Sequence, residues 1–435
     1  MSDLPAETDV VIVGGGLAGL AAARRLHRAG TPWLLVEAAD RLGGRVATDA
    51  VDGYLLDRGF QVVNTAYPRL TALVDVAALD LGLFTQGTLV RRGETLHRMV
   101  HPVREPLGAG RTVLTGLADA AGLGRAAQVP GVRQISSVGR ATDRLRLAAL
   151  AVRCATSPVD RLLAAPELST EMELRRAGLS DRIIEELLRP FLSGVFGERE
   201  LTTSSHVFAM IVRSFARGRI GLPAAGIGAL PQAVADPLPA SLTMRGVSAA
   251  SLRPGLVRTS AGDVRCRAVL VATDPVTAST LLPSLGRVRM HTLSTYYHSA
   301  VEPPLDEPIL LLDGDRRELV ANTVVVSRAA PTYAPVGRHL IATSVAGPIV
   351  PPEPLVRTEL ARLYGCSVED WDHLTTVTVP AALPAAPAPQ GSLRKPVVVG
   401  EGVFVAGDHR ASPSVQGALA SGWRAAGAVL RHLGR

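Results

Sequence analysis

The pattern of apolar and polar positions at the start of the chain predicts a strand, a helix and a second strand. A β-branched run over residues 9–13 is typical of a strand that is buried on both faces of a parallel sheet. Residues 17–29 have the spacing of a helix that ends at Gly30, and residues 33–37 form the next apolar strand. Together they predict a βαβ unit of about thirty residues, the length of a mononucleotide-binding half.

Further along the chain the pattern changes twice. From about 85 to 214 we expect helices rich in Ala, Arg and Leu, with clear 3.6-residue spacing over 140–153 and 181–189. Strand patterns then return at 252–257, at 264–272 after a turn at Gly262-Asp263, and through 290–345, with 319–326 and 340–345 as antiparallel examples. Residues 380–396 are rich in Pro and Ala and predict a surface connection before a last strand and helix.

These elements predict an α/β fold. We expect a discontinuous Rossmann-like domain of the two-dinucleotide-binding type, interleaved with an α+β substrate domain. Residues 1–84, 215–280 and 395–435 are assigned to the dinucleotide-binding domain, and residues 85–214 and 281–394 to the substrate domain. At 435 residues the chain is long enough for two domains.

The turn after the first strand has the glycine spacing of a dinucleotide-binding fingerprint. Gly14 permits the tight turn, Gly16 lets the backbone approach a phosphate, and Gly19 allows the helix to pack closely on the strand. The N-terminus of the helix then offers free N–H groups to a pyrophosphate. Glu37 ends the second strand, where its carboxylate can accept hydrogen bonds from the ribose hydroxyls of adenosine.

A second strand, turn and helix start lie near the end of the chain. Residues 403–408 have the sequence Val-Phe-Val-Ala-Gly-Asp, and the segment that begins at Gln416 follows eight residues later. A nucleotide needs only the first glycine turn, whereas a long dinucleotide such as FAD uses both pieces. The two segments therefore predict one flavin site and a redox enzyme.

Both segments resemble one superfamily. Residues 37–45, Glu-Ala-Ala-Asp-Arg-Leu-Gly-Gly-Arg, resemble the extended signature of flavin amine oxidases, protoporphyrinogen oxidases and phytoene-type desaturases. Residues 405–408 and 417–422 resemble its closing motif, and residues 57–61 and 222–230 look like segments that border the flavin there. Arg189 to Phe196 is similar to a bacterial and plastid branch near the desaturases. Outside the cofactor-binding parts the resemblance is loose.

The resemblance implies non-covalent FAD. In the superfamily the paired glycines form a second loop over the dinucleotide, and the following arginine contacts the pyrophosphate. The aspartate of the closing motif binds the ribityl or phosphate region, the next helix points its N-terminus at the flavin pyrimidine ring, and a valine contacts adenine through its backbone. Fingerprint and resemblance together predict the following cofactor-binding residues: Gly14, Gly16, Leu17, Ala18, Gly19, Glu37, Ala38, Arg41, Gly43, Gly44, Arg45, Gly59, Phe60, Gln61, Val247, Gly407, Asp408, Val415, Gln416 and Ala418.

Two departures from the amine oxidases narrow the chemistry. Many of those enzymes place a lysine near flavin N5, but the sole lysine here, Lys395, lies far along the chain from the sheet segment that would carry it. Monoamine oxidases frame the amine with aromatic rings, and Ser414 stands about where one ring would be. We therefore favour dehydrogenation of a hydrophobic substrate at a C–C or C–N bond, by hydride transfer to flavin N5.

Few side chains are candidates for catalysis. His409 follows Asp408 and is a candidate proton acceptor, although a histidine hydrogen-bonded in a turn is the simpler interpretation. Tyr296 is the second candidate, with packing as its alternative; strand alternation places Tyr296 and His298 on one face and Tyr297 on the other. Two further hypotheses stay open: a flavin amine oxidase acting on a small amine or polyamine, and a non-catalytic FAD-containing binding or chaperone-like protein.

Composition bounds the remaining partners. The net charge of +7 is spread over isolated arginine pairs, which indicates a solvated surface and no nucleic-acid partner. Three scattered cysteines favour a reducing cytosol over disulfides, and the sequence shows no metal-ligand cluster, so no metal site is expected. The sequence has no leader and no 18-residue apolar run, so we expect a soluble protein; the mildly positive mean hydropathy leaves a peripheral membrane contact open. Oxygen or a quinone is the expected electron acceptor, and a monomer and a homodimer are both compatible with the sequence.

Overall fold

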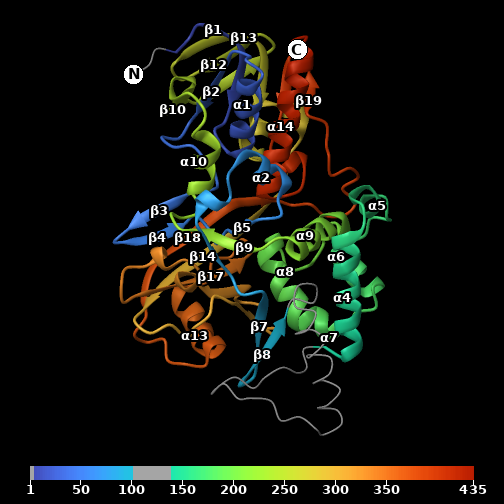
Figure 1. The fold of residues 1–435 in the computed structure, drawn as a ribbon, viewed down its shortest axis with the longest axis vertical. Coiled ribbons are helices and arrows are strands. Elements are labelled where there is room, and N and C mark those ends of the chain that lie inside the picture. The colour runs from blue at the N-terminus through green and yellow to red at the C-terminus, as the bar shows by residue number, and fades with distance from the viewer. Residues whose placement is uncertain (1–3, 101–138) are drawn as a thin grey trace.

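The computed structural model describes residues 4–100 and 139–435. Its two large sheets lie toward opposite ends of the molecule, and the chain termini lie at the same end as the first sheet (Figure 1). The strands of the first sheet come from both ends of the chain and from its middle. The strands of the second sheet come from the segments between them.

The first sheet contains the expected βαβ unit at its centre. Its strands follow the order β10-β2-β1-β13-β12-β11, with β20 paired to β13 and β19 paired to β20. Strands β10, β2, β1, β13 and β20 run parallel to their neighbours among these five. The strands are β1 (Glu7–Val13), β2 (Trp33–Glu37), β10 (Thr243–Arg245), β11 (Ala249–Arg253), β12 (Leu256–Thr259), β13 (Gly262–Val271), β19 (Val398–Gly400) and β20 (Val403–Val405).

Both faces of this sheet are buried, which explains the unbroken apolar run in β1. Val10 and Ile12 pack with the helices α1 (Leu17–Arg28), α10 (Ala229–Ala235) and α14 (Val415–His432). Val11 and Val13 point to the other face, which α11 (Pro275–Leu281) covers. The predicted strand, helix and strand over 9–37 are thereby confirmed.

The second sheet has seven strands in the order β18-β14-β17-β16-β15-β7-β8. Helix α13 (Glu353–Tyr364) packs on one face, and the helices between 141 and 217 pack near β7 and β15. The strands are β7 (Gly87–Arg92), β8 (Thr95–Val100), β14 (Met290–Ala300), β15 (Leu310–Asp313), β16 (Asn322–Val325), β17 (His339–Ala346) and β18 (Asp372–Pro384). The helices are α4 (Ala141–Thr156), α5 (Val159–Leu163), α6 (Thr170–Arg176), α7 (Asp181–Ile183), α8 (Arg189–Phe196), α9 (Ser205–Arg217) and α12 (Val326–Ala329).

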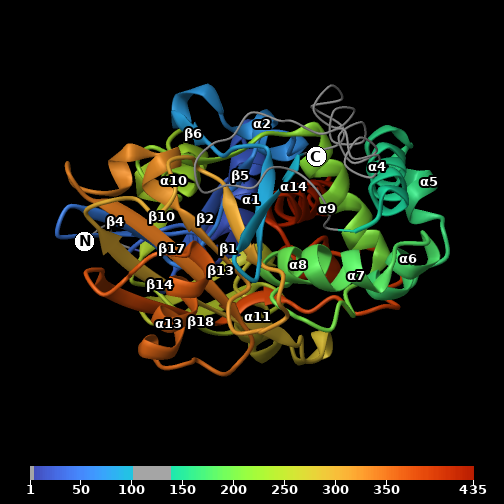
Figure 2. The same ribbon diagram turned by 90° about the horizontal axis from the view of Figure 1, so that it is seen from below.

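Small elements connect the two sheets. Figure 2 shows the same molecule from below, with the α4–α9 helices on one side of the second sheet. The connecting elements are the hairpin β3 (Thr48–Val51) and β4 (Tyr54–Asp57), the three-stranded sheet β5 (Val63–Asn64), β9 (Ile220–Pro223) and β6 (Leu81–Leu83), and helix α2 (Pro68–Leu73).

Three element predictions were wrong at their edges. Residues 87–100 form the hairpin β7–β8, because Gly93 turns the chain at a positive φ and β7 then pairs with β15; residues 101–138 lie outside the described residues. The expected strand at 252–257 crosses a turn at 254–255, and Gly262 starts β13 instead of forming a turn. The first part of 380–396 belongs to β18, because this strand pairs with β14 as far as Pro384.

The assignment of domains stays a prediction. The first sheet draws its strands from within 1–84, 215–280 and 395–435, and the second sheet from within 85–214 and 281–394. Within the described ranges, no helix combines the length and the apolar character needed to cross a membrane. All three cysteines are free thiols; Cys154 and Cys266 are buried, whereas Cys366 is exposed.

Candidate functional site

Four parallel strands of the first sheet end at one edge, which we call the carboxyl edge. It is defined by Val13, Glu37, Val271 and Val405, the last residues of β1, β2, β13 and β20. Ligands of open α/β sheets bind outside the carboxyl ends of the strands. Most of the predicted cofactor residues lie directly beyond these four positions.

The fingerprint glycines form an open cradle at this edge. Gly14 has a φ of +105°, and a Cβ there would lie 2.8 Å from the backbone of Ala272. A Cβ on Gly19 would lie 1.9 Å from the carbonyl oxygen of Gly14, so α1 can start close to β1 only with glycine at this position. A Cβ on Gly16 would meet nothing within 4 Å. The fold therefore needs Gly14 and Gly19, while Gly16 faces free space at the helix N-terminus, where Leu17 and Ala18 begin α1.

The loop after β2 closes over this cradle. The N–H of Gly43 donates to the carbonyl of Gly15 over 2.9 Å, and Gly16 bridges to Gly43. The Glu37 carboxylate accepts hydrogen bonds from the N–H groups of Gly15 (2.6 Å) and Ala39 (2.8 Å). A carboxylate has further acceptor capacity, so Glu37 can still receive ribose hydroxyls.

The remaining predicted residues of the adenosine side lie around the same loop. The N–H of Val247 donates to the Glu37 carbonyl over 2.9 Å, which brings the backbone of Val247 beside the end of β2. The Arg41 side chain donates to the carbonyl of Gly44 within this loop, and Ala38 directly follows Glu37 at its start. The structure thus brings together residues that the sequence separates by more than 200 positions.

An ion pair at the carboxyl edge joins the N-terminal part of the chain to its C-terminal part. The Arg45 guanidinium donates to Asp408 Oδ1 over 2.8 Å and to the carbonyl of Ala382 over 2.8 Å. Burial by itself would lower the pKa of Arg45, but Asp408 raises it above its ordinary value. The side chain of Asp408 is 7% exposed and depends on Arg45 for its neutralisation.

The start of α14 lies next to this ion pair. The Ser414 hydroxyl accepts a hydrogen bond from the N–H of Gly417 and caps the helix, which leaves the first N–H groups, at Val415 and Gln416, without acceptors inside the helix. The N–H of Gly407 donates to the hydroxyl of Ser421 one turn after Ala418. The helix N-terminus is therefore fixed near Asp408 and available to an anionic ring edge.

His409 lies buried at the same place. Its side chain stacks against Gly407, because a Cβ on Gly407 would lie 2.5 Å from His409 Nδ1. Neither ring nitrogen has a hydrogen-bond partner among the described residues. Burial lowers the pKa of His409 to about 4, against the opposing effect of Asp408. The expected turn hydrogen bond of this ring is absent from the described contacts, so its nitrogens are free for a bound molecule.

These observations fit a flavin dinucleotide. The open space at Gly16 and the N-terminus of α1 suit the pyrophosphate, together with Arg45. The N-terminus of α14 suits the pyrimidine end, and the turn at 408–410, which carries the unpartnered ring of His409, packs against this helix.

The 57–61 segment joins the carboxyl edge to the second sheet. Gln61 donates to the carbonyl of Arg45 over 2.9 Å, and the N–H of Phe60 donates to Thr295 Oγ1 of β14 over 3.1 Å. Gly59 directly precedes Phe60 and has a φ of +92°. The predicted residues Gly59, Phe60 and Gln61 therefore lie between Arg45 and β14.

Asp57 was missed as a site-supporting residue. Its carboxylate is 2% exposed and accepts hydrogen bonds from Thr48 Oγ1, the N–H of Ile227 and the Tyr333 hydroxyl, while the Tyr297 hydroxyl donates to its carbonyl. Burial raises the pKa of Asp57 to about 6, against the lowering effect of these hydrogen bonds. The signal in the sequence is an acidic residue that ends the apolar strand β4.

Replacing Asp57 tests this role through the pH dependence of stability. The pKa of Asp57 is higher in the folded protein than its ordinary value of 3.8. The folded state therefore binds more protons than the unfolded state between pH 3.8 and 6, and the contribution of this group to stability falls as the pH rises through that window. We expect the unfolding free energy of wild type, measured relative to Asp57→Asn by urea denaturation, to fall by about 2 kcal/mol from pH 4 to pH 7. Asp57→Ala, which leaves three buried donors unpaired, should cost about 2–4 kcal/mol. A difference between wild type and Asp57→Asn that does not change with pH would contradict the assignment.

The two faces of β14 are chemically different. Thr295, Tyr297 and Ser299 face Phe60, Asp57 and Tyr54, respectively, which is the side of the 57–61 segment. Tyr296 and His298 point to the other face, beneath α13, as the alternation predicts. The Tyr296 hydroxyl donates to the carbonyl of Pro351, so its position favours packing over catalysis.

Neither Trp371 nor Lys395 lies on the face of β14 that carries Tyr297. Trp371 packs against Tyr364 and His298 on the α13 face, away from Tyr297. Lys395 lies in the loop before β19, where its N–H donates to the carbonyl of Arg410, and not on β14. Burial and Arg410 lower the pKa of Lys395.

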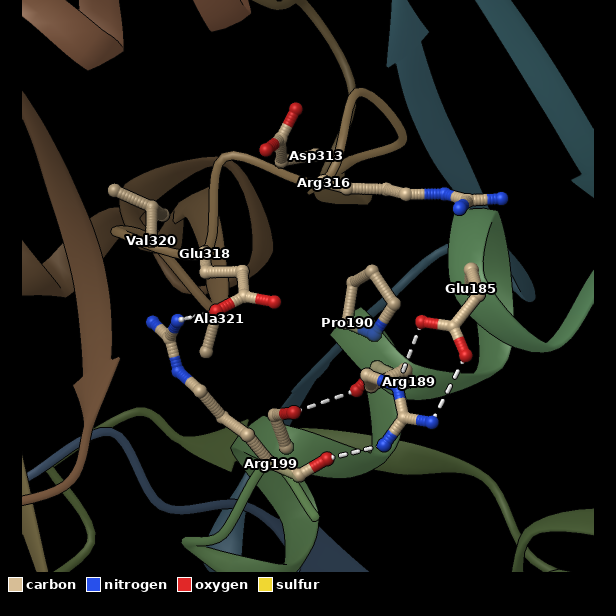
Figure 3. A pocket seen from close by; sticks show the side chains of 10 residues that line it. Glu185, Arg189, Pro190, Arg199, Asp313, Arg316, Glu318, Val320 and Ala321 are labelled. Carbon is tan, nitrogen blue, oxygen red and sulfur yellow. Dashed lines mark hydrogen bonds and ion pairs between the residues drawn. The ribbon is translucent and has the colours of Figure 1, made fainter. Parts of the chain in front are cut away.

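The segment from Arg189 to Phe196 lines a separate pocket (Figure 3). Arg189 pairs with Glu185 over 2.8 Å and donates to the carbonyl of Arg199 over 2.6 Å, so it anchors the start of α8. His206 bonds to the carbonyl of Ala165 over 2.9 Å. Neither residue lies at the carboxyl edge.

Comparison with known proteins identifies the family of this chain. A family model described as flavin containing amine oxidoreductase matches residues 17–430. The chain therefore belongs to the flavin-containing amine oxidoreductase family, and its cofactor is non-covalent FAD.

Particular relatives match shorter stretches. The chain is 44% identical to putrescine oxidase of Kocuria rosea over 96 residues, 22% of this chain and 19% of that protein. It is 34% identical to chloroplastic protoporphyrinogen oxidase 1 of Arabidopsis thaliana over 195 residues, 43% of this chain and 30% of that protein. These alignments span less than a third of either relative. A solved structure from Exiguobacterium sp. 255-15, provisionally assigned as a protoporphyrinogen oxidase, has a TM-score of 0.70 at 19% identity, with 100% of both chains covered, which shows the likeness of fold.

Proposed function

We propose that the protein is an FAD-dependent oxidoreductase that dehydrogenates a hydrophobic small molecule at a C–C or C–N bond. The observation that carries this proposal is the neutral face of β14. The side chains that β14 presents toward the 57–61 segment are Thr295, Tyr297 and Ser299; the sole lysine, Lys395, is not on this strand and acts electrostatically on His409 instead. Burial raises the pKa of Tyr297 well above its ordinary value, so this phenol stays uncharged.

The apolar surroundings of this face support the same substrate class. The rings of Phe60 and Phe84 pack edge to face with their centres 6.0 Å apart. Both belong to a cluster with Tyr297, Leu222 and Val377. A cationic amine would lose hydration against such a surface, and the nearby Asp57 carboxylate is 2% exposed and already accepts three hydrogen bonds. An uncharged, apolar substrate gains by the same burial.

The chain's own residues position the reaction. When bound, FAD supplies the two-electron acceptor for the hydride that leaves the substrate. Arg45 and the N-terminus of α1 would hold the pyrophosphate, the N-terminus of α14 would stabilise charge on the pyrimidine ring, and Glu37 with Val247 would hold the adenosine end. The proton that leaves the substrate moves to a ring nitrogen of His409, which is neutral above pH 4.

His409→Ala tests this proton acceptor. We expect the variant to retain FAD and to lose turnover by about 10²–10⁴-fold, the usual contribution of a positioned base. Because burial lowers the pKa of His409 to about 4, the wild-type rate should rise as the pH rises through about 4, and the variant should lack this limb. His206→Ala is the matched control, since this buried histidine bonds to a backbone carbonyl away from the edge. A His409→Ala enzyme with wild-type turnover would remove the residue from the mechanism.

The substrate class is tested by anaerobic mixing of the FAD-loaded protein with two sets of donors. We expect bleaching of the flavin by hydrophobic polyenes or cyclic tetrapyrrole precursors, and slow or no bleaching by putrescine and other small amines. Rapid reduction by small amines alone would favour an amine oxidase. A flavin that photoreduces but accepts electrons from neither set would favour the non-catalytic alternative.

We further propose oxygen or a quinone as the acceptor and the cytosol as the compartment. The three free thiols support a reducing environment. A monomer and a homodimer both remain compatible with the proposal, as does a peripheral membrane contact.

A further inference from the structure

Three arginines surround one tryptophan on the helices that cover the first sheet. The guanidinium carbons of Arg25, Arg28 and Arg69 lie 5.3, 5.6 and 4.7 Å from the centre of the Trp423 ring. They come from α1 and α2, which both pack against α14, the helix that carries Trp423 (Figures 1 and 2). Arg431 lies two turns further along α14 and acts electrostatically on Arg25.

These arginines have no acidic partner in the described part of the chain. The ion pairs among residues 4–100 and 139–435 include none with Arg25, Arg28, Arg69 or Arg431. Burial lowers the pKa of Arg25, and the positive charges of Arg431 and Arg69 lower it further. The cluster is therefore an uncompensated group of like charges.

Two details indicate an anion-binding site. The three guanidinium carbons lie within 5.6 Å of one ring centre, and the charges of Arg69 and Arg431 lower the pKa of Arg25, so these groups repel one another. In addition, Nε of Arg69 is buried and has no hydrogen-bond acceptor among the described residues. A buried donor without an acceptor in a positively charged cluster is the expected sign of a bound oxyanion or water.

The cluster lies at the far end of α1 from the pyrophosphate cradle, and it touches the predicted cofactor residues at one place, where the backbone N–H of Arg69 donates to Gln416 Oε1 over 2.9 Å. Arg25 and Arg28 lie in the last turn of α1, whereas the pyrophosphate cradle is at its first turn. The helix has twelve residues, which corresponds to a separation of about 18 Å.

We propose that Trp423 with Arg25, Arg28, Arg69 and Arg431 forms a binding site for a phosphate group, either free or at the end of a larger molecule. Guanidinium groups present paired N–H donors that match the oxygens of a phosphate. The indole ring keeps three of these groups within 5.6 Å of its centre, and Arg25 also donates to the Trp423 carbonyl over 2.7 Å, which limits their reorganisation when the phosphate binds.

The test uses the FAD-loaded protein, so that the cofactor cradle is filled. Titration calorimetry with inorganic phosphate, at constant ionic strength maintained with chloride, should give saturable binding at one site. Arg69→Gln and Arg28→Gln should each weaken binding at least tenfold. Arg253→Gln, which removes an exposed arginine on β11, is the control and should leave binding unchanged. Arg28 is exposed, so its variant is expected to fold normally.

A second arm identifies the source of the phosphate. Co-sedimentation with phosphatidylcholine vesicles that contain phosphatidic acid, lost in Arg28→Gln, would identify a lipid headgroup, and phosphate binding without co-sedimentation would identify a soluble ligand; both outcomes support the site. Heats that do not saturate, or that equal those of chloride, would overturn it. So would unchanged phosphate affinity in both arginine variants.

Discussion

Replacing Arg45 with alanine is expected to abolish tight FAD binding and to destabilise the protein. The substitution removes the guanidinium that faces the pyrophosphate cradle and leaves Asp408, whose side chain is 7% exposed, without its partner. A buried charge that loses its partner costs about 3–5 kcal/mol. We expect an FAD affinity at least 100-fold lower by fluorescence titration, and an unfolding free energy of the FAD-free protein lower by about 3 kcal/mol.

Three controls separate the two effects. Arg45→Ala combined with Asp408→Asn removes the unpaired charge and should restore most of the folding stability, while FAD affinity stays low. Arg45→Lys keeps a charge without the planar fork and should be intermediate. Arg58→Ala breaks the exposed pair with Asp49 and should cost less than about 1 kcal/mol, with FAD affinity unchanged. Wild-type FAD affinity in Arg45→Ala would show that the guanidinium does not contact the cofactor.

Gly16→Val is expected to fold and yet fail to bind FAD. A Cβ at Gly16 meets nothing within 4 Å, and its backbone lies at φ −73° and ψ 177°, a conformation that valine adopts without strain. The added side chain would fill the space at the helix N-terminus that the pyrophosphate needs. We expect urea denaturation of the FAD-free protein to change by less than about 0.5 kcal/mol, and FAD affinity to fall at least 100-fold.

Gly19→Ala is the matched contrast three residues away. Its Cβ would lie 1.9 Å from the carbonyl oxygen of Gly14, so the expected effect is a loss of stability of about 1–3 kcal/mol through overpacking. The FAD affinity of the folded protein should then stay near the wild-type value, and FAD binding should fall only by the fraction of protein that is unfolded. Equal FAD affinity in Gly16→Val and wild type would mean that the cofactor does not approach the backbone at Gly16.

The sequence predicted the parts of the site whose residues are local. The glycines from Gly14 to Gly19 and the buried strand before them follow from backbone geometry, which a short segment specifies by itself. The ion pair between Arg45 and Asp408 was not predictable as a contact, because its partners lie 363 positions apart and meet only when β2 and β20 end at the same edge. Each residue was nevertheless placed in the cofactor set through the resemblance.

Long-range packing decided the rest. Asp57 looked like one residue of a motif, and only the fold brings Thr48, Ile227 and Tyr333 to its carboxylate. Residues 87–100 have many polar side chains and few signals other than Gly93, and their strand character comes from pairing with β15 more than 200 residues later. The sequence named Tyr296 as the candidate and placed Tyr297 on the opposite face of its strand, but only the fold shows that the Tyr297 face is the one turned toward the 57–61 segment.

An absorbance spectrum of the purified protein tests the central claim most directly. We predict oxidised flavin bands that bleach on anaerobic photoreduction and return when an electron acceptor is added. If oxygen is the acceptor, the bands return within seconds in air; if a quinone is the acceptor, they return faster with the quinone than in air. The Gly16→Val protein, prepared in the same way, should lack these bands. A wild-type protein that shows no flavin bands even after FAD is added back would contradict the account.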